Sequence, residues 1–215
     1  MTESTLNRCR TNEEAANSIT HGVGIVLAVA ATAVLAISAG IQGSARAIVS
    51  GSIFGATLIL LYTASTLYHS ARNSHAKAIL KTLDHCAIFL LIAGTYTPFA
   101  MVTLHGPWGW SLLTAIWAMA IFGIVFEMTR WRRHRMVSLG LYLGMGWAVV
   151  AVIKPLQARI EPGGLILLLA GGIAYTAGVF FYVFRKIPYH HAIWHLFVLA
   201  GSTLHFFAIL FFVIA

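Results

Sequence analysis

Long uninterrupted apolar runs constrain the fold of this chain more than any other feature of its sequence. Runs of roughly 18 or more apolar residues recur along the 215 residues, and each is long enough to cross a bilayer core of about 30 Å. Charged residues make up 9% of the chain, whereas they make up about a quarter of a soluble domain. The runs are continuous rather than alternating, which argues against a β-barrel. We therefore expect an all-α integral membrane protein.

The apolar runs predict a bundle of seven transmembrane helices. We expect these helices at about residues 19–41, 47–69, 84–103, 108–127, 136–153, 164–184 and 189–215. Residues 1–18 are then a polar N-terminal tail, and residues 19–215 form the helical domain. No cleavage site follows the first run, so we expect it to be retained as a helix. Pro98 should kink the third helix or free a carbonyl for a neighbour.

The basic residues predict how the bundle lies in the membrane. Of the 14 Arg and Lys residues, 11 fall in the tail and in the second, fourth and sixth loops. Cytoplasmic segments carry such an excess, so we expect a cytoplasmic N-terminus, an external C-terminus and a place in the cell inner (plasma) membrane. The most basic loop, residues 130–135, either only fixes this orientation or also touches anionic head groups. Because the basic residues lie in short loops, the sequence does not indicate nucleic-acid binding.

Helix topology brings three histidines and the one aspartate of the chain to the same depth. His191 and His195 are four residues apart, so they share one face of the last helix. Such a pair can hold a metal ion, or it can be interfacial or hydrogen-bonded in a core. His69 closes the second helix and Asp84 opens the third, at the same end of the bundle. Three histidines with an open position form a hydrolytic zinc site, although copper, iron and nickel also accept imidazole.

Asp84 and Ser65 are the predicted catalytic residues beside this zinc site. Asp84 is either a fourth ligand or the general base for the metal's water. Ser65 lies one turn before His69, where it can orient a ligand or donate to an oxyanion, unless it only packs helices closely. His205 lies about 15 Å beyond His195, so we expect it to bond another helix instead. Neither cysteine belongs to a CxxC pair, so no thiolate metal site is indicated.

Short polar motifs lie near the ends of four of the predicted helices. Glu14, Asn17, Thr20 and His21 open the first helix, Ser65 and His69 close the second, Asp84 opens the third ahead of Gly94 and Pro98, and His191 and His195 open the last ahead of Gly201 and His205. In order and spacing these residues resemble the hemolysin III family of bacterial membrane proteins. That family is related to the adiponectin and progestin receptors (the PAQR proteins) and, more distantly, to alkaline ceramidases.

The resemblance implies a zinc ion held by His69, His191 and His195, with Asp84 contacting it through water. It also implies a lipid or fatty acid inside the helix bundle, and hydrolysis of a ceramide-like amide or ester as the activity. Two alternatives follow from the same resemblance: a pore-forming cytolysin, and a non-catalytic sensor of lipid state with structural zinc. Neither the oligomeric state nor the roles of Glu14, Asn17 and Thr20 follow from the sequence. His21 either supports the zinc site or caps the first helix.

Overall fold

The structure is a computed structural model that describes residues 3–129 and 134–214, and these parts of the chain are helical throughout apart from short turns. Its elements are α1 (Glu3–Ile41), α2 (Ala45–Ser70), α3 (Ser74–Pro98), the π-helix η1 (Phe99–Leu104), α4 (Gly106–Met128), α5 (Arg135–Gly146), the 3₁₀-helix η3 (Ala148–Val152), α6 (Ile153–Gln157), α7 (Pro162–Val183), α8 (His190–Ile209) and the π-helix η4 (Leu210–Ile214). Within the described residues, seven segments are long and apolar enough to span a membrane. The predicted number of spans is therefore confirmed.

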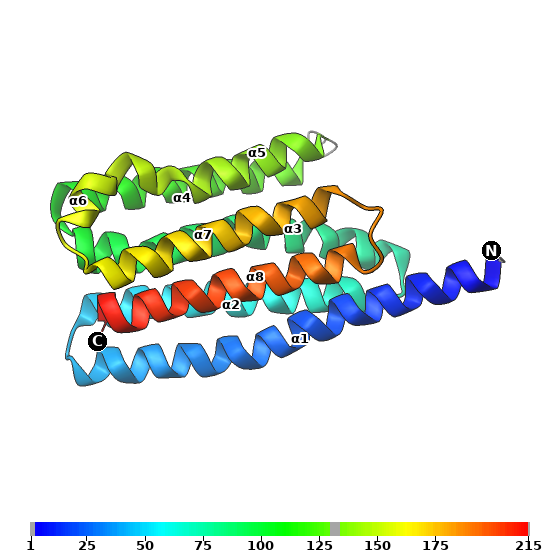
Figure 1. The fold of residues 1–215 in the computed structure, drawn as a ribbon, viewed down its shortest axis with the longest axis horizontal. Helices are drawn as coiled ribbons and strands as arrows, with labels where there is room; N and C mark the ends of the chain where they lie inside the picture. Colours follow the sequence, from blue (N-terminus) through cyan, green and yellow to red (C-terminus); the bar gives the residue numbers. More distant parts are fainter. Residues whose placement is uncertain (1–2, 130–133, 215) are drawn as a thin grey trace.

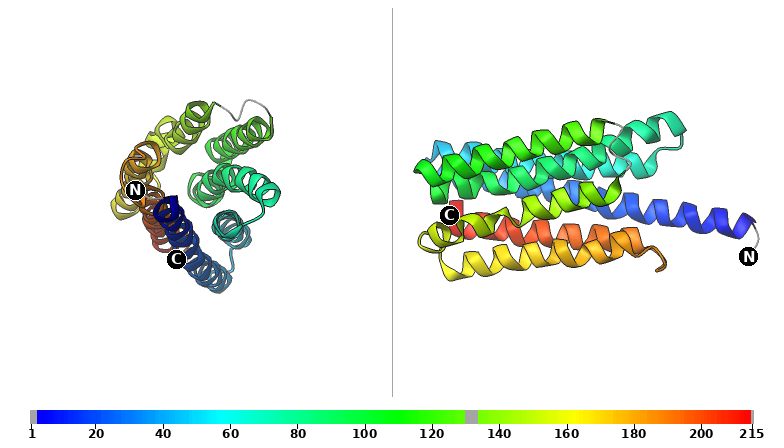
Figure 2. Two further views of the ribbon diagram at one scale, coloured as in Figure 1. Left: turned by 90° about the vertical axis from the view of Figure 1, so that its right-hand side faces the viewer. Right: turned by 90° about the horizontal axis from the view of Figure 1, so that it is seen from above.

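The spanning segments pack mostly in chain order, and the last one returns to the first (Figure 1). α1 packs on α2, α2 on α3, and α3 on α4, while α7 packs on α8 and α8 on α1. The end-on view in Figure 2 shows these helices arranged around a common centre. The fifth span is built from α5, η3 and α6 together. Helices from opposite ends of the chain, α1 and α8, thus lie side by side.

The outer surface of the bundle is apolar along the spans. Large hydrophobic side chains such as Val26, Ile37, Phe122, Ile166 and Phe180 are exposed on it. A soluble monomer rarely exposes apolar surface so widely. In a bilayer the same side chains contact lipid tails at no cost, which accounts for a membrane-spanning bundle.

Two of the predicted helix starts were wrong. The third helix was expected to begin at Asp84, but α3 begins at Ser74, and the Asn73 side chain accepts a hydrogen bond from the Ala76 backbone N–H at its first turn. The prediction placed Lys77 and Lys81 in a loop because they are charged, yet a helix that leaves the membrane can carry them. Similarly, α1 begins at Glu3 rather than near residue 19, and its first turns project beyond the other helices (Figure 1). The division of the chain at residue 18 stays a prediction.

The winding of the third span changes at Pro98. The α-helix ends at this residue, and the chain continues as the π-helix η1. Proline has no N–H to donate to the preceding turn. The predicted kink or freed carbonyl stays a prediction. The predicted basic loop of residues 130–135 lies largely outside the described residues, because residues 130–133 are not among them.

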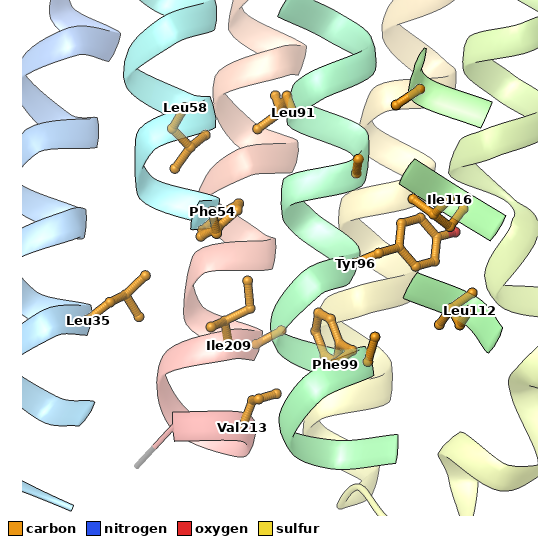
Figure 3. Packing of buried hydrophobic residues seen from close by; sticks show 14 of the residues in the cluster. Leu35, Phe54, Leu58, Leu91, Tyr96, Phe99, Leu112, Ile116, Ile209 and Val213 are labelled. Carbon is orange, nitrogen blue, oxygen red and sulfur yellow. The ribbon is translucent and has the colours of Figure 1, made fainter. Parts of the chain in front are cut away.

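Buried hydrophobic side chains fill the half of the bundle away from the predicted zinc site. Figure 3 shows Leu35, Phe54, Phe99 and Ile209, which belong to one buried cluster and come from α1, α2, η1 and α8. Glycine permits the closest approach: a Cβ at Gly109 on α4 would lie 2.2 Å from the backbone oxygen of Ala100 on η1. Because that contact involves backbone, a side-chain rotation cannot relieve it. This tight half gives the bundle a rigid base.

We predict that Gly109→Ala destabilises the bundle by about 1–3 kcal/mol, the usual range for overpacking a core. Thermal unfolding in detergent micelles measures the effect. Gly140→Ala is the matched control, because nothing lies within 4 Å of a Cβ at that helical position. The control should be neutral or stabilising by up to about 1 kcal/mol, since alanine favours helix over glycine. Equal unfolding temperatures for wild type and Gly109→Ala would contradict the packing described here.

Candidate metal centre

Three histidines meet at the end of the bundle opposite the tight core. His69 closes α2, while His191 and His195 lie one turn apart at the start of α8. One ligand nitrogen from each lies within 4.8 Å of the others, and the ring centroids are 4.7–5.1 Å apart. His69 and His195 are buried, and His191 is half-buried. The structure therefore brings together the three side chains that the sequence analysis predicted as ligands.

A carboxylate on α1 determines which nitrogen of His69 is available. His69 Nδ1 lies 2.7 Å from Glu14 Oε2, and the other Glu14 oxygen accepts a hydrogen bond from Lys77 Nζ at 2.8 Å. An ionised carboxylate only accepts hydrogen bonds, so Nδ1 carries the proton of the neutral ring. The remaining nitrogen, Nε2, is buried and has no hydrogen-bond partner. Its lone pair is free to bind a cation.

His195 is oriented in the same way, again by α1. Its Nδ1 lies 3.1 Å from the Asn17 carbonyl oxygen and 3.1 Å from Thr20 Oγ1. The carbonyl can only accept, so His195 also carries its proton on Nδ1. Histidines that bind metal usually donate their other ring N–H to a carboxylate or carbonyl in this manner. Glu14, Asn17 and Thr20, whose roles the sequence left open, thus support the two buried histidines.

The donor set fits zinc. It consists of three imidazoles, two of them with the tautomer fixed so that Nε2 keeps its lone pair, and zinc in hydrolytic sites commonly has three protein ligands. Among the described residues, this trio is the group of His, Cys, Asp and Glu side chains close enough to share one metal ion. We therefore treat His69, His191 and His195 as a candidate metal centre.

Asp84 and Ser65 lie beside this centre, as the sequence analysis predicted. Asp84, in the third turn of α3, is buried, and Ser65 is buried one turn before His69 on α2. Both line one cavity together with His191 and His195. The buried Ser65 hydroxyl faces the Asp84 carboxyl, so the two side chains act on the same part of that cavity. The position of both side chains is suited to the predicted catalytic roles.

The cavity is mostly apolar beyond the candidate metal centre. It runs between α3, α5, α7 and α8, and its walls include Ile92, Leu143, Val179 and Val198. It reaches His205, about 15 Å farther along α8 than His195 at helical rise. As predicted, His205 bonds another helix, with its Nε2 3.1 Å from the Leu168 carbonyl on α7. A mostly apolar cavity that extends from His191 to His205 can accommodate hydrocarbon.

A second, polar hollow opens at the same end of the bundle. Glu14, Lys81, Arg135 and Arg185 line it, and it shares Asp84, His85, Tyr182 and His191 with the apolar cavity. The candidate metal centre therefore lies where a polar opening meets an apolar chamber. That junction suits a molecule with a polar head and an apolar tail.

Sequence reasoning missed the buried carboxylate of Glu127. It was placed at the end of the fourth helix and given no role, yet it is only 2% exposed. Ser138 on α5 donates a hydrogen bond to it, and His85 Nδ1 lies 3.5 Å from its other oxygen. A glutamate inside a spanning segment was the available signal, because such residues are rare and usually face the bundle interior. Glu127 links three helices beside the polar hollow.

Comparison with known proteins supports one family over almost the whole chain. A family model described as "Haemolysin-III related" matches residues 9–206. Hemolysin-3 of Bacillus cereus is 48% identical over 202 residues, which cover 94% of this chain and 92% of that protein. The Hemolysin-3 homolog of Bacillus subtilis is 48% identical over 200 residues, covering 93% and 94%. The human Monocyte to macrophage differentiation factor is 32% identical over 205 residues, covering 92% and 83%.

We predict that Glu14→Ala weakens zinc affinity about 10- to 100-fold, the usual cost of removing the partner behind a ligating histidine. Competition with a chelator of known zinc affinity measures the change. Glu13→Ala is the matched control: Glu13 is the neighbouring acid, but it accepts a hydrogen bond from the Tyr189 backbone N–H instead. Unchanged affinity in Glu14→Ala, or an equal loss in both variants, would contradict the role given to Glu14.

Proposed function

Because the chain belongs to the haemolysin-III-related family of membrane proteins, we propose that it is a zinc-dependent hydrolase of membrane lipids. Its substrate class is an acyl lipid with an amide or ester bond. The observation that carries this proposal is the position of the three converging histidines at the polar end of an apolar cavity, next to a buried carboxylate. A head group would lie in the polar hollow and the acyl chain in the cavity.

His69, His191 and His195 would hold the zinc ion, with the first and last fixed by α1. Zinc in such a site supplies an activated water and polarises a carbonyl group. The apolar walls would exclude water from the acyl-chain side of the centre, while the polar hollow opens on its other side. On the acyl-chain side, the low dielectric would strengthen the electrostatic contacts of the reacting groups.

Asp84 is proposed as the general base. Its carboxylate would take a proton from the attacking water and return it to the leaving group, which is the usual work of such a residue. Ser65, buried beside Asp84, would donate its hydroxyl proton in a hydrogen bond to the carbonyl oxygen as negative charge develops there. Both side chains reach the same cavity from different helices.

The proposal also includes an orientation in the plasma membrane, with the candidate metal centre at the cytoplasmic end. Eleven of the 14 Arg and Lys residues lie in the segments predicted to be cytoplasmic. An alkaline phosphatase fusion at the C-terminus should be active, since that enzyme needs an external location, and a fusion after Met128 should be inactive. The reverse pattern would overturn the orientation.

We predict that Asp84→Asn lowers lipid hydrolysis by about 10²- to 10⁴-fold, the range for loss of a general base. Turnover of long-chain N-acyl amides and esters by purified protein, beside zinc content, provides the measurement. Ser18→Ala is the control, because Ser18 lies at the same end of the bundle in an exposed hydrogen bond with Ser70. Wild-type turnover in Asp84→Asn would overturn the mechanism.

The same purified protein distinguishes hydrolysis from the two alternative functions, a lipid sensor with structural zinc and a pore-forming cytolysin. A protein that hydrolyses nothing, but loses thermal stability when zinc is chelated, has a structural zinc ion and no hydrolase activity. Haemolysis is attributed by name to the relative from Bacillus cereus, and it would require the purified chain to release dye from liposomes. Dye release that is unaffected by His69→Ala, without lipid turnover, would favour pore formation over the proposed hydrolysis.

A further inference from the structure

His21 on α1 is buried beside the candidate metal centre with nothing to satisfy its polar atoms. The residue is 3% exposed, and neither ring nitrogen has a hydrogen-bond partner. No other histidine in residues 3–129 and 134–214 has both nitrogens buried in this state. A neutral imidazole has one N–H and one lone pair, and leaving such groups unpaired in an apolar interior costs stability. A phenylalanine would fill the same space without that cost.

The His21 ring is held firmly where it is. It stacks on His195 with centroids 3.6 Å apart and an angle of 11°, and it meets the Tyr62 ring edge-on at 5.0 Å. It lies one helical turn beyond Asn17, whose carbonyl orients His195. His21 is therefore about 6 Å deeper along α1 than that support. Its nitrogens do not belong to the trio that can share a metal ion.

His21 also lines the apolar cavity, in company with Asp84, Ser65, His191 and His195. His21 is thus at the end of the cavity near the candidate metal centre, and hydrocarbon side chains such as Leu61, Ile92 and Val198 also line this cavity. An amphipathic molecule in the cavity would have its head-group oxygens at this end and its hydrocarbon chain among those side chains.

We propose that His21 is a substrate-contacting residue that donates its ring N–H to the acyl oxygen of the cavity's occupant. This inference rests on the proposed function, in which the cavity binds an acyl lipid. It adds the contact that determines how far the lipid head group enters the cavity. The hydrogen bond pairs the buried N–H, and the stacked His195 keeps the ring aligned with the candidate metal centre. From this donor and the apolar cavity, we expect the occupant to carry an oxygen acceptor at one end of a long hydrocarbon chain.

Equilibrium binding of radiolabelled palmitic acid and hexadecane to the purified full chain tests the proposal. The two probes have the same chain length, but only palmitic acid carries oxygen. His21→Phe keeps a ring and removes the donor, so it should weaken palmitic acid binding about tenfold and leave hexadecane binding unchanged. His21→Gln retains an N–H donor, so it should restore affinity to within about threefold of wild type. Zinc content should not change in either variant.

Four outcomes would overturn the inference: wild-type palmitic acid binding in His21→Phe, an equal loss of both probes, a loss of zinc, or no palmitic acid binding by wild type. If His21→Phe does not fold, ring ¹⁵N NMR of the wild type replaces it. The His21 signals, assigned by their loss in His21→Gln, should shift on addition of palmitic acid and not of hexadecane. Binding that depends on His21 without any lipid hydrolysis would refute the proposed hydrolase and leave this contact intact.

Discussion

A buried imidazole is stabilised when each of its nitrogens has a partner, and this preference organises the candidate metal centre. Leaving a buried polar atom unpaired costs on the order of 1–3 kcal/mol. His69 and His195 each pair one nitrogen with α1, through Glu14 and the Asn17 carbonyl. The nitrogens that remain converge with His191. α1 contributes no ligand of its own, yet it decides which atoms are available to bind.

The bundle combines a tightly packed half with a hollow half. In the first, helices approach so closely that several glycines leave no room for a methyl group, and buried side chains interlock across the spans (Figure 3). In the second, a polar hollow and an apolar cavity meet at Asp84 and His191. The candidate metal centre therefore lies where the helices leave space between them.

Much of this architecture could be predicted from the sequence because it follows from length and periodicity. Continuous apolar runs identify the spans, and helical rise then places His69, His191 and His195 at one depth. The start of α3 could not be predicted this way, because Lys77 and Lys81 look like loop residues until Glu14 is known to lie beside Lys77. The spacing of apolar residues shows which face of a helix contacts lipid or the apolar core. It says nothing about polar partners that come from a distant helix.

The same limit explains why the burial of Glu127 and the unpaired nitrogens of His21 could not be predicted from the sequence. Hydropathy places Glu127 at the end of a span, and only the packing of α3 and α5 around it reveals that it is buried. His21 was correctly associated with the metal end, but its two unpaired nitrogens are a property of three-dimensional surroundings. Long-range polar contacts are therefore the part of this site that needs coordinates.

The adjacency of α1 and α8 has a consequence for biogenesis. One candidate metal ligand comes from the second span and two from the last, while the supports come from the first. A ribosome delivers these segments to the membrane in order, so α8 is inserted after α1 and α2. Under the proposed function, the three histidines would come together only once α8 has packed against α1 and α2. Cation capture would therefore depend on the correct insertion of both the early and the late spans, and a copy in which either is misinserted would lack the site.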